Sequence, residues 1–170
     1  MFSSKAQLLK RTPENGTDRE SFLSLLLDEY LHSSSYDSKC QVLANLANFA
    51  YDPINYEYIR DVGVLDIFIH VIKHETDHKL LRYAVAGICN LICDSLNAEY
   101  ILCHCGLKPI ISLLQVDNTD IIADTITTLI YLKEFKRDIN SEEVMTNIQA
   151  IQNSNNKMLS NLATLYLQDV

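Results

Sequence analysis

Glycine and proline are scarce in this chain, with 4 and 3 residues among 170, and tryptophan is absent. Folds made only of β-strands depend on glycine- and proline-rich turns, so this scarcity favours long helices joined by short turns. Long apolar runs are missing too, because no stretch approaches the roughly 20 residues that span a bilayer. The first residues also lack the apolar core of a signal peptide.

Basic residues are outnumbered, with 14 Lys and Arg against 22 Asp and Glu and a net charge of −8. An acidic surface repels phosphate backbones, which opposes direct RNA binding and favours a protein partner with a basic segment. The 5 cysteines are odd in number and lie mostly in apolar helical patterns. This usage predicts free thiols in a reducing compartment.

What the chain does contain is an internal repeat, formed by residues 43–59 and 85–101. Five identities recur 42 residues apart, namely Asn48 and Asn90, Asp52 and Asp94, Asn55 and Asn97, Glu57 and Glu99, and Tyr58 and Tyr100. A fixed period in the low forties in a helical chain indicates stacked helical repeats, which typically serve as binding surfaces.

Capping and turn residues predict the unit within each repeat. Asp52 followed by Pro53 predicts a helix start, and Gly63 and Gly106 predict the next turns. We expect Thr17 to cap the first helix in a capping box with Glu20. The expected helices lie at about 37–51, 54–61, 64–73, 95–104, 107–115, 119–133, 142–152 and 155–168. The domain organisation is a flexible polar leader (1–18) and one helical domain (19–170).

This three-helix unit resembles the armadillo repeat, whose third helix carries a polar residue at the place of Asn48 and Asn90. Residues 42–53 with 55–58 are similar to the hallmark run of the armadillo repeat-containing protein 7 family. Residues 89–91, 123–132 and 161–169 fit it as well, so the resemblance covers roughly residues 20–170. It implies an all-α, right-handed armadillo-type α-solenoid of about three to four repeats with truncated terminal caps.

The resemblance also implies a function. Members of this family are non-enzymatic nuclear adaptors that pair with an RNA-binding-motif protein, RNA-binding motif protein 48, and support splicing of minor-class (U12-type) introns. We therefore expect a heterodimer in the nucleus, with the cytoplasm as a second location, and no membrane association. The alternative is a general armadillo peptide-binding module with an unrelated partner.

The third helices of a solenoid line one face, and we expect the partner to bind there. An asparagine carboxamide both donates and accepts, so it can pair with an extended backbone, and tyrosines offer broad contact area. For Asn48 and Asn90, the alternatives are a solvated helix face or a bond to the neighbouring repeat. The predicted partner-binding residues are Gln41, Asn45, Asn48, Tyr51, Tyr56, Tyr83, Asn90, Asp124 and Tyr131.

Two clusters of cysteine and histidine residues suggest a metal or catalytic site, but their spacing fits such a site poorly. Cys89 and Cys93 precede the run 103–105 (Cys-His-Cys), yet the spacing departs from paired zinc knuckles, and buried cysteine is commonly a small apolar residue. His70, His74 and His78 step by four, but a helix start expected at Asp77 interrupts that face. No phosphate loop or nucleophile elbow occurs. We predict no catalytic residues, metal or cofactor, against the alternative of a metal- or thiol-dependent enzyme.

Overall fold

The structure is a computed structural model that describes residues 2–4, 6–7, 10, 16–135 and 139–168. Its described residues form helices and connections, with no strand among them. In chain order the elements are α2 (Arg19–His32), α3 (Tyr36–Ala50), η1 (Pro53–Asn55), α4 (Tyr56–Val62), α5 (Val64–His74), α6 (His78–Leu91), α7 (Ser95–His104), α8 (Leu107–Ser112), η2 (Leu113–Gln115), α9 (Thr119–Phe135), α10 (Glu142–Gln152) and α11 (Lys157–Gln168).

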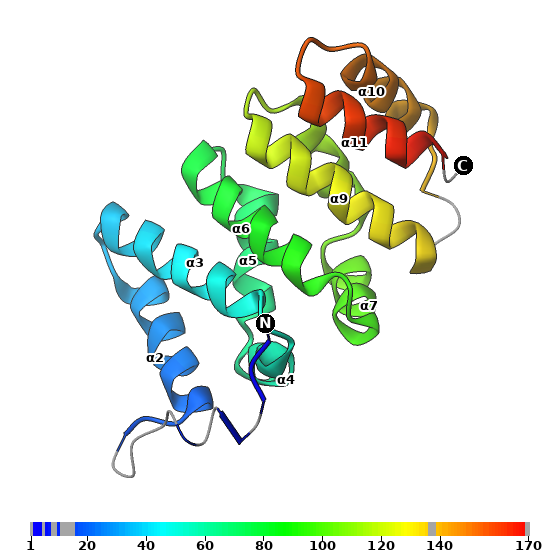
Figure 1. Ribbon diagram of the computed structural model, residues 1–170. Helices are drawn as coiled ribbons and strands as arrows, with labels where there is room; N and C mark the ends of the chain where they lie inside the picture. The colour runs from blue at the N-terminus through cyan, green and yellow to red at the C-terminus, as the bar shows by residue number, and fades with distance from the viewer. Residues whose placement is uncertain (1, 5, 8–9, 11–15, 136–138, 169–170) are drawn as a thin grey trace.

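The helices stack as repeats. Among these elements, two full units, α4-α5-α6 and α7-α8-α9, are flanked by the helix pairs α2-α3 and α10-α11. The last helices of the four units, α3, α6, α9 and α11, lie side by side and each packs on the next (Figure 1). This arrangement confirms the predicted all-α solenoid of three to four repeats with shortened ends.

Aspartates begin several of these helices. Asp52, Asp77 and Asp94 each accept a backbone N–H of the first turn that follows, which satisfies donors that a helix start leaves unpaired. The prediction that Thr17 caps the first helix is wrong. Asp18 occupies that position and accepts the Ser21 N–H at 2.8 Å.

Glycine is required at one left-handed turn and at one close contact between helices. Gly63 has φ +87° and ends α4, in the left-handed region that a side chain disfavours. Gly87 lies inside α6, where a Cβ would stand 2.5 Å from the Phe68 ring of α5. The missing side chain therefore sets how closely α5 and α6 pack.

Buried polar residues mark the joints between successive units. At the joint of the two full units, here called the second joint, Asn97 is fully buried and its Nδ2 donates to the Leu91 carbonyl at 3.2 Å. Arg60 reaches across from α4 and donates from Nη1 to Asp94 Oδ1 at 3.0 Å and to Asn97 Oδ1 at 2.8 Å. The guanidinium thus ties one unit to the next.

The first residues of the chain contact the C-terminal end of α3. The Phe2 and Tyr51 ring centroids lie 5.7 Å apart, and the Ser3 N–H donates to Asp52 Oδ2 at 2.9 Å. No sequence pattern pointed to this contact, because Phe2 and Ser3 lie outside the repeat.

Within the described part of the chain, no helix is both long and apolar enough to cross a bilayer.

Candidate functional site

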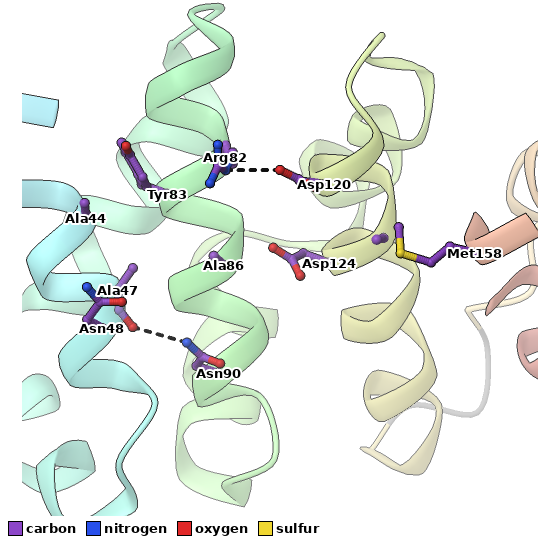
Figure 2. Close-up of a pocket in the computed structure, with 11 residues that line it drawn as sticks. Ala44, Ala47, Asn48, Arg82, Tyr83, Ala86, Asn90, Asp120, Asp124 and Met158 are labelled. Carbon is purple, nitrogen blue, oxygen red and sulfur yellow. Dashed lines mark hydrogen bonds and ion pairs between the residues drawn. The ribbon is translucent and has the colours of Figure 1, made fainter. Parts of the chain in front are cut away.

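The last helices of the units enclose a cavity of about 440 Å³, here called the groove (Figure 2). Its walls come from α3, α6 and α9, and α11 adds one residue. The lining residues are Ala44, Ala47, Asn48, Arg82, Tyr83, Ala86, Asn90, Asp120, Ala123, Asp124 and Met158.

Small side chains form much of the groove surface. Ala44, Ala86 and Ala123 contribute one methyl group each, from α3, α6 and α9 respectively. A side chain of that size lets another backbone approach a helix closely, while the longer neighbours supply polar atoms. The groove is therefore shaped to take an extended chain more readily than a bulky globular protrusion.

The two asparagines that are equivalent in sequence behave differently. Asn48 is exposed to the groove. Asn90 is half-buried, and its Nδ2 donates to the Ala47 carbonyl of α3 at 3.2 Å (Figure 2). Asn90 therefore satisfies the alternative interpretation, a bond to the neighbouring repeat, whereas the Asn48 carboxamide is placed for a ligand.

One side of the groove is acidic. Burial and, to a smaller extent, the neighbouring Asp120 together raise the pKa of the Asp124 carboxyl from 3.8 to about 6, while Arg82 opposes the shift. Arg82 Nε lies 3.3 Å from Asp120 Oδ2, an ion pair that crosses from α6 to α9 (Figure 2). A cationic ligand would relieve the repulsion between Asp120 and Asp124, so this side of the groove favours positive charge.

Among the lining residues that were missed from the sequence, Asp120, Arg82 and Met158 have the longest side chains. Asp120 precedes the predicted Asp124 by one helical turn, so the same periodicity could have found it. Arg82 also stands 5.7 Å from the centroid of the predicted Tyr83 ring, and adjacency in the chain was its only signal. Met158 comes from the shortened last unit, where the repeat pattern is too weak to place it.

Five of the nine predicted contact residues lie outside the groove, among them Gln41, Asn45 and Tyr131. The Gln41 Nε2 donates to Asn45 Oδ1 at 3.2 Å, so these two side chains on α3 satisfy each other in part. Tyr131 is 38% exposed on α9 and does not line the groove. Their contact with a partner stays a prediction.

Tyr51 and Tyr56, the two predicted tyrosines near the end of α3, differ in exposure. Tyr51 is 61% exposed and available to a partner apart from its contact with Phe2. Tyr56 is only 8% exposed, and its hydroxyl donates to the Asn90 carbonyl at 2.8 Å. The prediction of Tyr56 as a surface contact needs correction, because its side chain packs against the C-terminal end of α6 in its own unit and offers a partner almost no area.

A second cavity of about 390 Å³, here called the joint pocket, opens beside α2 and the end of α3. The Arg19 guanidinium stands over the Phe49 ring at 4.7 Å from its centroid. Asn48 borders both this pocket and the groove. The lining residues are Arg19, Asn45, Asn48, Phe49, Asp52 and Asn55.

The cysteines and histidines do not assemble a site. Burial raises the pKa of the Cys89 thiol to about 12 and that of the Cys105 thiol to about 11, which disfavours the thiolate that metal binding and nucleophilic attack require. His70 and His74 contact each other, with ring centroids 4.8 Å apart. Among the described residues, no three His, Cys, Asp or Glu side chains are grouped closely enough to hold a metal ion.

Solved structures similar to this one include designed armadillo repeat proteins. A designed armadillo repeat protein in complex with the peptide (KR)4 superposes with a TM-score of 0.76 at 16% identity, over 86% of this chain and 63% of that one. Armadillo repeat proteins computationally designed for modular peptide recognition give 0.76 at 17% identity, over 86% and 63%. The chain spans about 63% of the length of these designed proteins, and the likeness shows the armadillo fold.

A curated protein shows closer similarity in sequence. No protein-family model matches the chain. Armadillo repeat-containing protein 7 of Mus musculus is 38% identical to it over 170 residues, which cover 96% of this chain and 83% of the mouse protein. The chain therefore belongs to the armadillo repeat-containing protein 7 family.

Proposed function

We propose that this chain is a non-enzymatic adaptor whose groove binds an extended segment of a protein partner. The observation that carries the proposal is the groove itself. In it the exposed Asn48 lies beside a surface of alanine side chains and opposite Asp124. The carboxamide can pair with a peptide backbone, and the acidic wall favours a basic residue in the same segment.

The partner proposed is an RNA-binding-motif protein, RNA-binding motif protein 48, and the process is splicing of minor-class introns in the nucleus. Membership of the armadillo repeat-containing protein 7 family supports this choice. The net charge of −8 supports a division of labour in which the partner, and not this chain, contacts RNA. An unrelated partner with a basic extended segment is the alternative.

A bulky residue in the groove tests the binding mode. Ala86→Arg fills the floor of the groove and adds a like charge for a basic segment, whereas Ala150→Arg makes the same change on an exposed position of α10. We expect Ala86→Arg to weaken binding of recombinant RNA-binding motif protein 48 at least about tenfold in calorimetry, since a filled groove excludes the segment. Ala150→Arg should bind as the unchanged chain does.

The outcomes distinguish the proposed binding surface from the proposed identity of the partner. Equal binding by Ala86→Arg and Ala150→Arg, with both variants folded by circular dichroism, would place the partner on another surface. No binding of RNA-binding motif protein 48 to the unchanged chain would remove that partner. In that case, mass spectrometry of proteins captured from nuclear extract by the unchanged chain but not by Ala86→Arg would support the alternative partner.

A further inference from the structure

The second joint shows how this fold holds a guanidinium. Arg60 Nη1 donates to both Asp94 Oδ1 and Asn97 Oδ1, at 3.0 and 2.8 Å, while Asn97 Nδ2 is held by the Leu91 carbonyl. The acceptor pair is thus one carboxylate oxygen and one amide oxygen, both fixed by their own backbone contacts.

The first joint, between the α2-α3 unit and α4, repeats this acceptor pair 42 residues earlier. Asn55 Nδ2 donates to the Phe49 carbonyl at 2.8 Å, as Asn97 does to Leu91. Asp52 takes the place of Asp94, and its Oδ1 accepts only a long 3.3 Å bond from the Ile54 N–H among the described residues.

No guanidinium among the described residues donates to the amide oxygen of this pair, although Arg19 lies in the same pocket. Asn55 is 3% exposed, and its Oδ1 has no hydrogen-bond partner among the described residues. Buried amide oxygens are nearly always paired, so this one marks a place where a donor belongs.

The surroundings of the first joint fit a protein surface. The joint pocket of about 390 Å³ leads to Asp52 and Asn55. Phe22 on α2 is 40% exposed and contacts the Phe49 ring that lines the pocket, with ring centroids 5.7 Å apart, and Tyr51, which directly follows α3, is 61% exposed. Exposed aromatic side chains are enriched at protein interfaces, as is arginine.

We propose that the first joint is an arginine site, which the protein partner of the proposed function fills with one guanidinium. The nitrogen donates to Asp52 Oδ1 and Asn55 Oδ1, as Arg60 does to Asp94 and Asn97. A guanidinium suits this pair better than an ammonium because its planar fork presents donors in fixed directions and loses less hydration on burial. The proposal rests on a protein partner, but the site can be tested without one.

Arg19 is the internal competitor for this site. Its side chain lines the same pocket, stands over Phe49, and has a buried Nε without a partner among the described residues. Because Arg19 is a like charge, its removal should strengthen binding of an incoming arginine.

The test is an NMR titration of the full, isotope-labelled chain with N-acetyl-arginine amide. The neutral isostere N-acetyl-citrulline amide is the comparator. We expect saturable shifts of the Asn55 side-chain NH₂ signals with the arginine compound and none with citrulline. Asp52→Asn keeps a capping acceptor but loses the charge, so it should weaken binding about tenfold, the usual effect of losing a charged hydrogen-bond partner.

Asp94→Asn is the matched control, since its joint already contains Arg60; it should leave the Asn55 shifts unchanged. Arg19→Gln should increase the affinity. The proposal is overturned if the arginine compound leaves Asn55 unshifted, or if Asp52→Asn and Asp94→Asn bind alike. Binding that is seen only in Arg19→Gln would mean that the Arg19 guanidinium itself occupies the site in the unchanged chain, and it would overturn the proposal. Ala86→Arg should leave these shifts intact, so failure of the groove and failure of the arginine site are told apart.

Discussion

At the scale of single residues, position in the repeat decides which polar group is free. Asn48 and Asn90 are equivalent in sequence, yet Asn90 donates to the Ala47 carbonyl and Asn48 is exposed. The difference arises because Asn90 has an earlier unit to bond, whereas Asn48 lies on the last helix of the first described unit.

This difference predicts unequal effects of the same substitution. Asn90→Ala should lower the free energy of unfolding by about 1 kcal/mol relative to Asn48→Ala, because only Asn90 makes an internal hydrogen bond. Urea denaturation of both variants measures the difference, and the shared change in helix propensity cancels. Equal stabilities would mean that the Asn90 bond contributes nothing in solution.

The Asp124 carboxyl predicts a pH dependence. Its pKa rises from 3.8 to about 6 on folding, so the native state binds more protons than the unfolded state between these pH values. Stability from this group is therefore present below pH 4 and is lost as pH rises towards 7. The stability of the unchanged chain minus that of Asp124→Asn should fall across this range in thermal unfolding. A difference that is flat or rises with pH would contradict the raised pKa.

Residues of the groove could be predicted from sequence only where the repeat is clear. Asn48, Asn90, Tyr83 and Asp124 follow from the period, and all four line the groove. Tyr56 was misplaced because a tyrosine without a counterpart in the next repeat looks like a surface specialisation. It instead fills space between the start of α4 and the end of α6, and Cys93 Sγ, just after α6, lies 3.2 Å from its hydroxyl.

At the scale of helices, the helix boundaries follow from local chemistry, whereas the distances between helices do not. Asp52, Asp94 and Gly63 marked helix ends correctly because capping and left-handed turns are decided by neighbouring backbone atoms. The close approach of α5 and α6 depends on Gly87 meeting Phe68, two residues 19 apart whose contact no local pattern reports.

Gly87→Ala tests that approach. Alanine would normally stabilise a helix interior by about 1 kcal/mol. Here its Cβ would meet the Phe68 ring at 2.5 Å, and such overpacking costs about 1–3 kcal/mol, so we expect a net loss of stability in chemical denaturation. Phe68→Leu combined with Gly87→Ala should destabilise less than the sum of the two single changes. Additive losses would show that the ring is not the obstacle.

At the scale of the whole molecule, stability is shared between units and the contacts that join them. Solenoid units contact mainly their neighbours, so each joint sets how cooperatively the chain unfolds. Arg60 bonds across the second joint, where its side chain is 24% exposed.

Arg60→Met keeps the aliphatic stem but removes the donors of Asp94 and Asn97. It should lower the free energy of unfolding by about 1–3 kcal/mol, because a buried amide oxygen is left unpaired. It should also broaden the urea transition as the units on either side uncouple. A sharp transition with unchanged midpoint would mean that apolar packing alone couples the units. Lys79→Met, an exposed change on α6, is the control for lost positive charge.

Asn48 borders both the groove and the joint pocket, so the two cavities lie on either side of one residue. A partner segment seated in the groove would hold its own arginine near the first joint at an effective concentration in the millimolar range, as short tethers do. An arginine too weak to bind alone would then add to the total affinity. The number of residues between the groove-binding stretch and that arginine would determine whether both sites can be filled at once. The adaptor would thereby distinguish one basic sequence from another of the same charge.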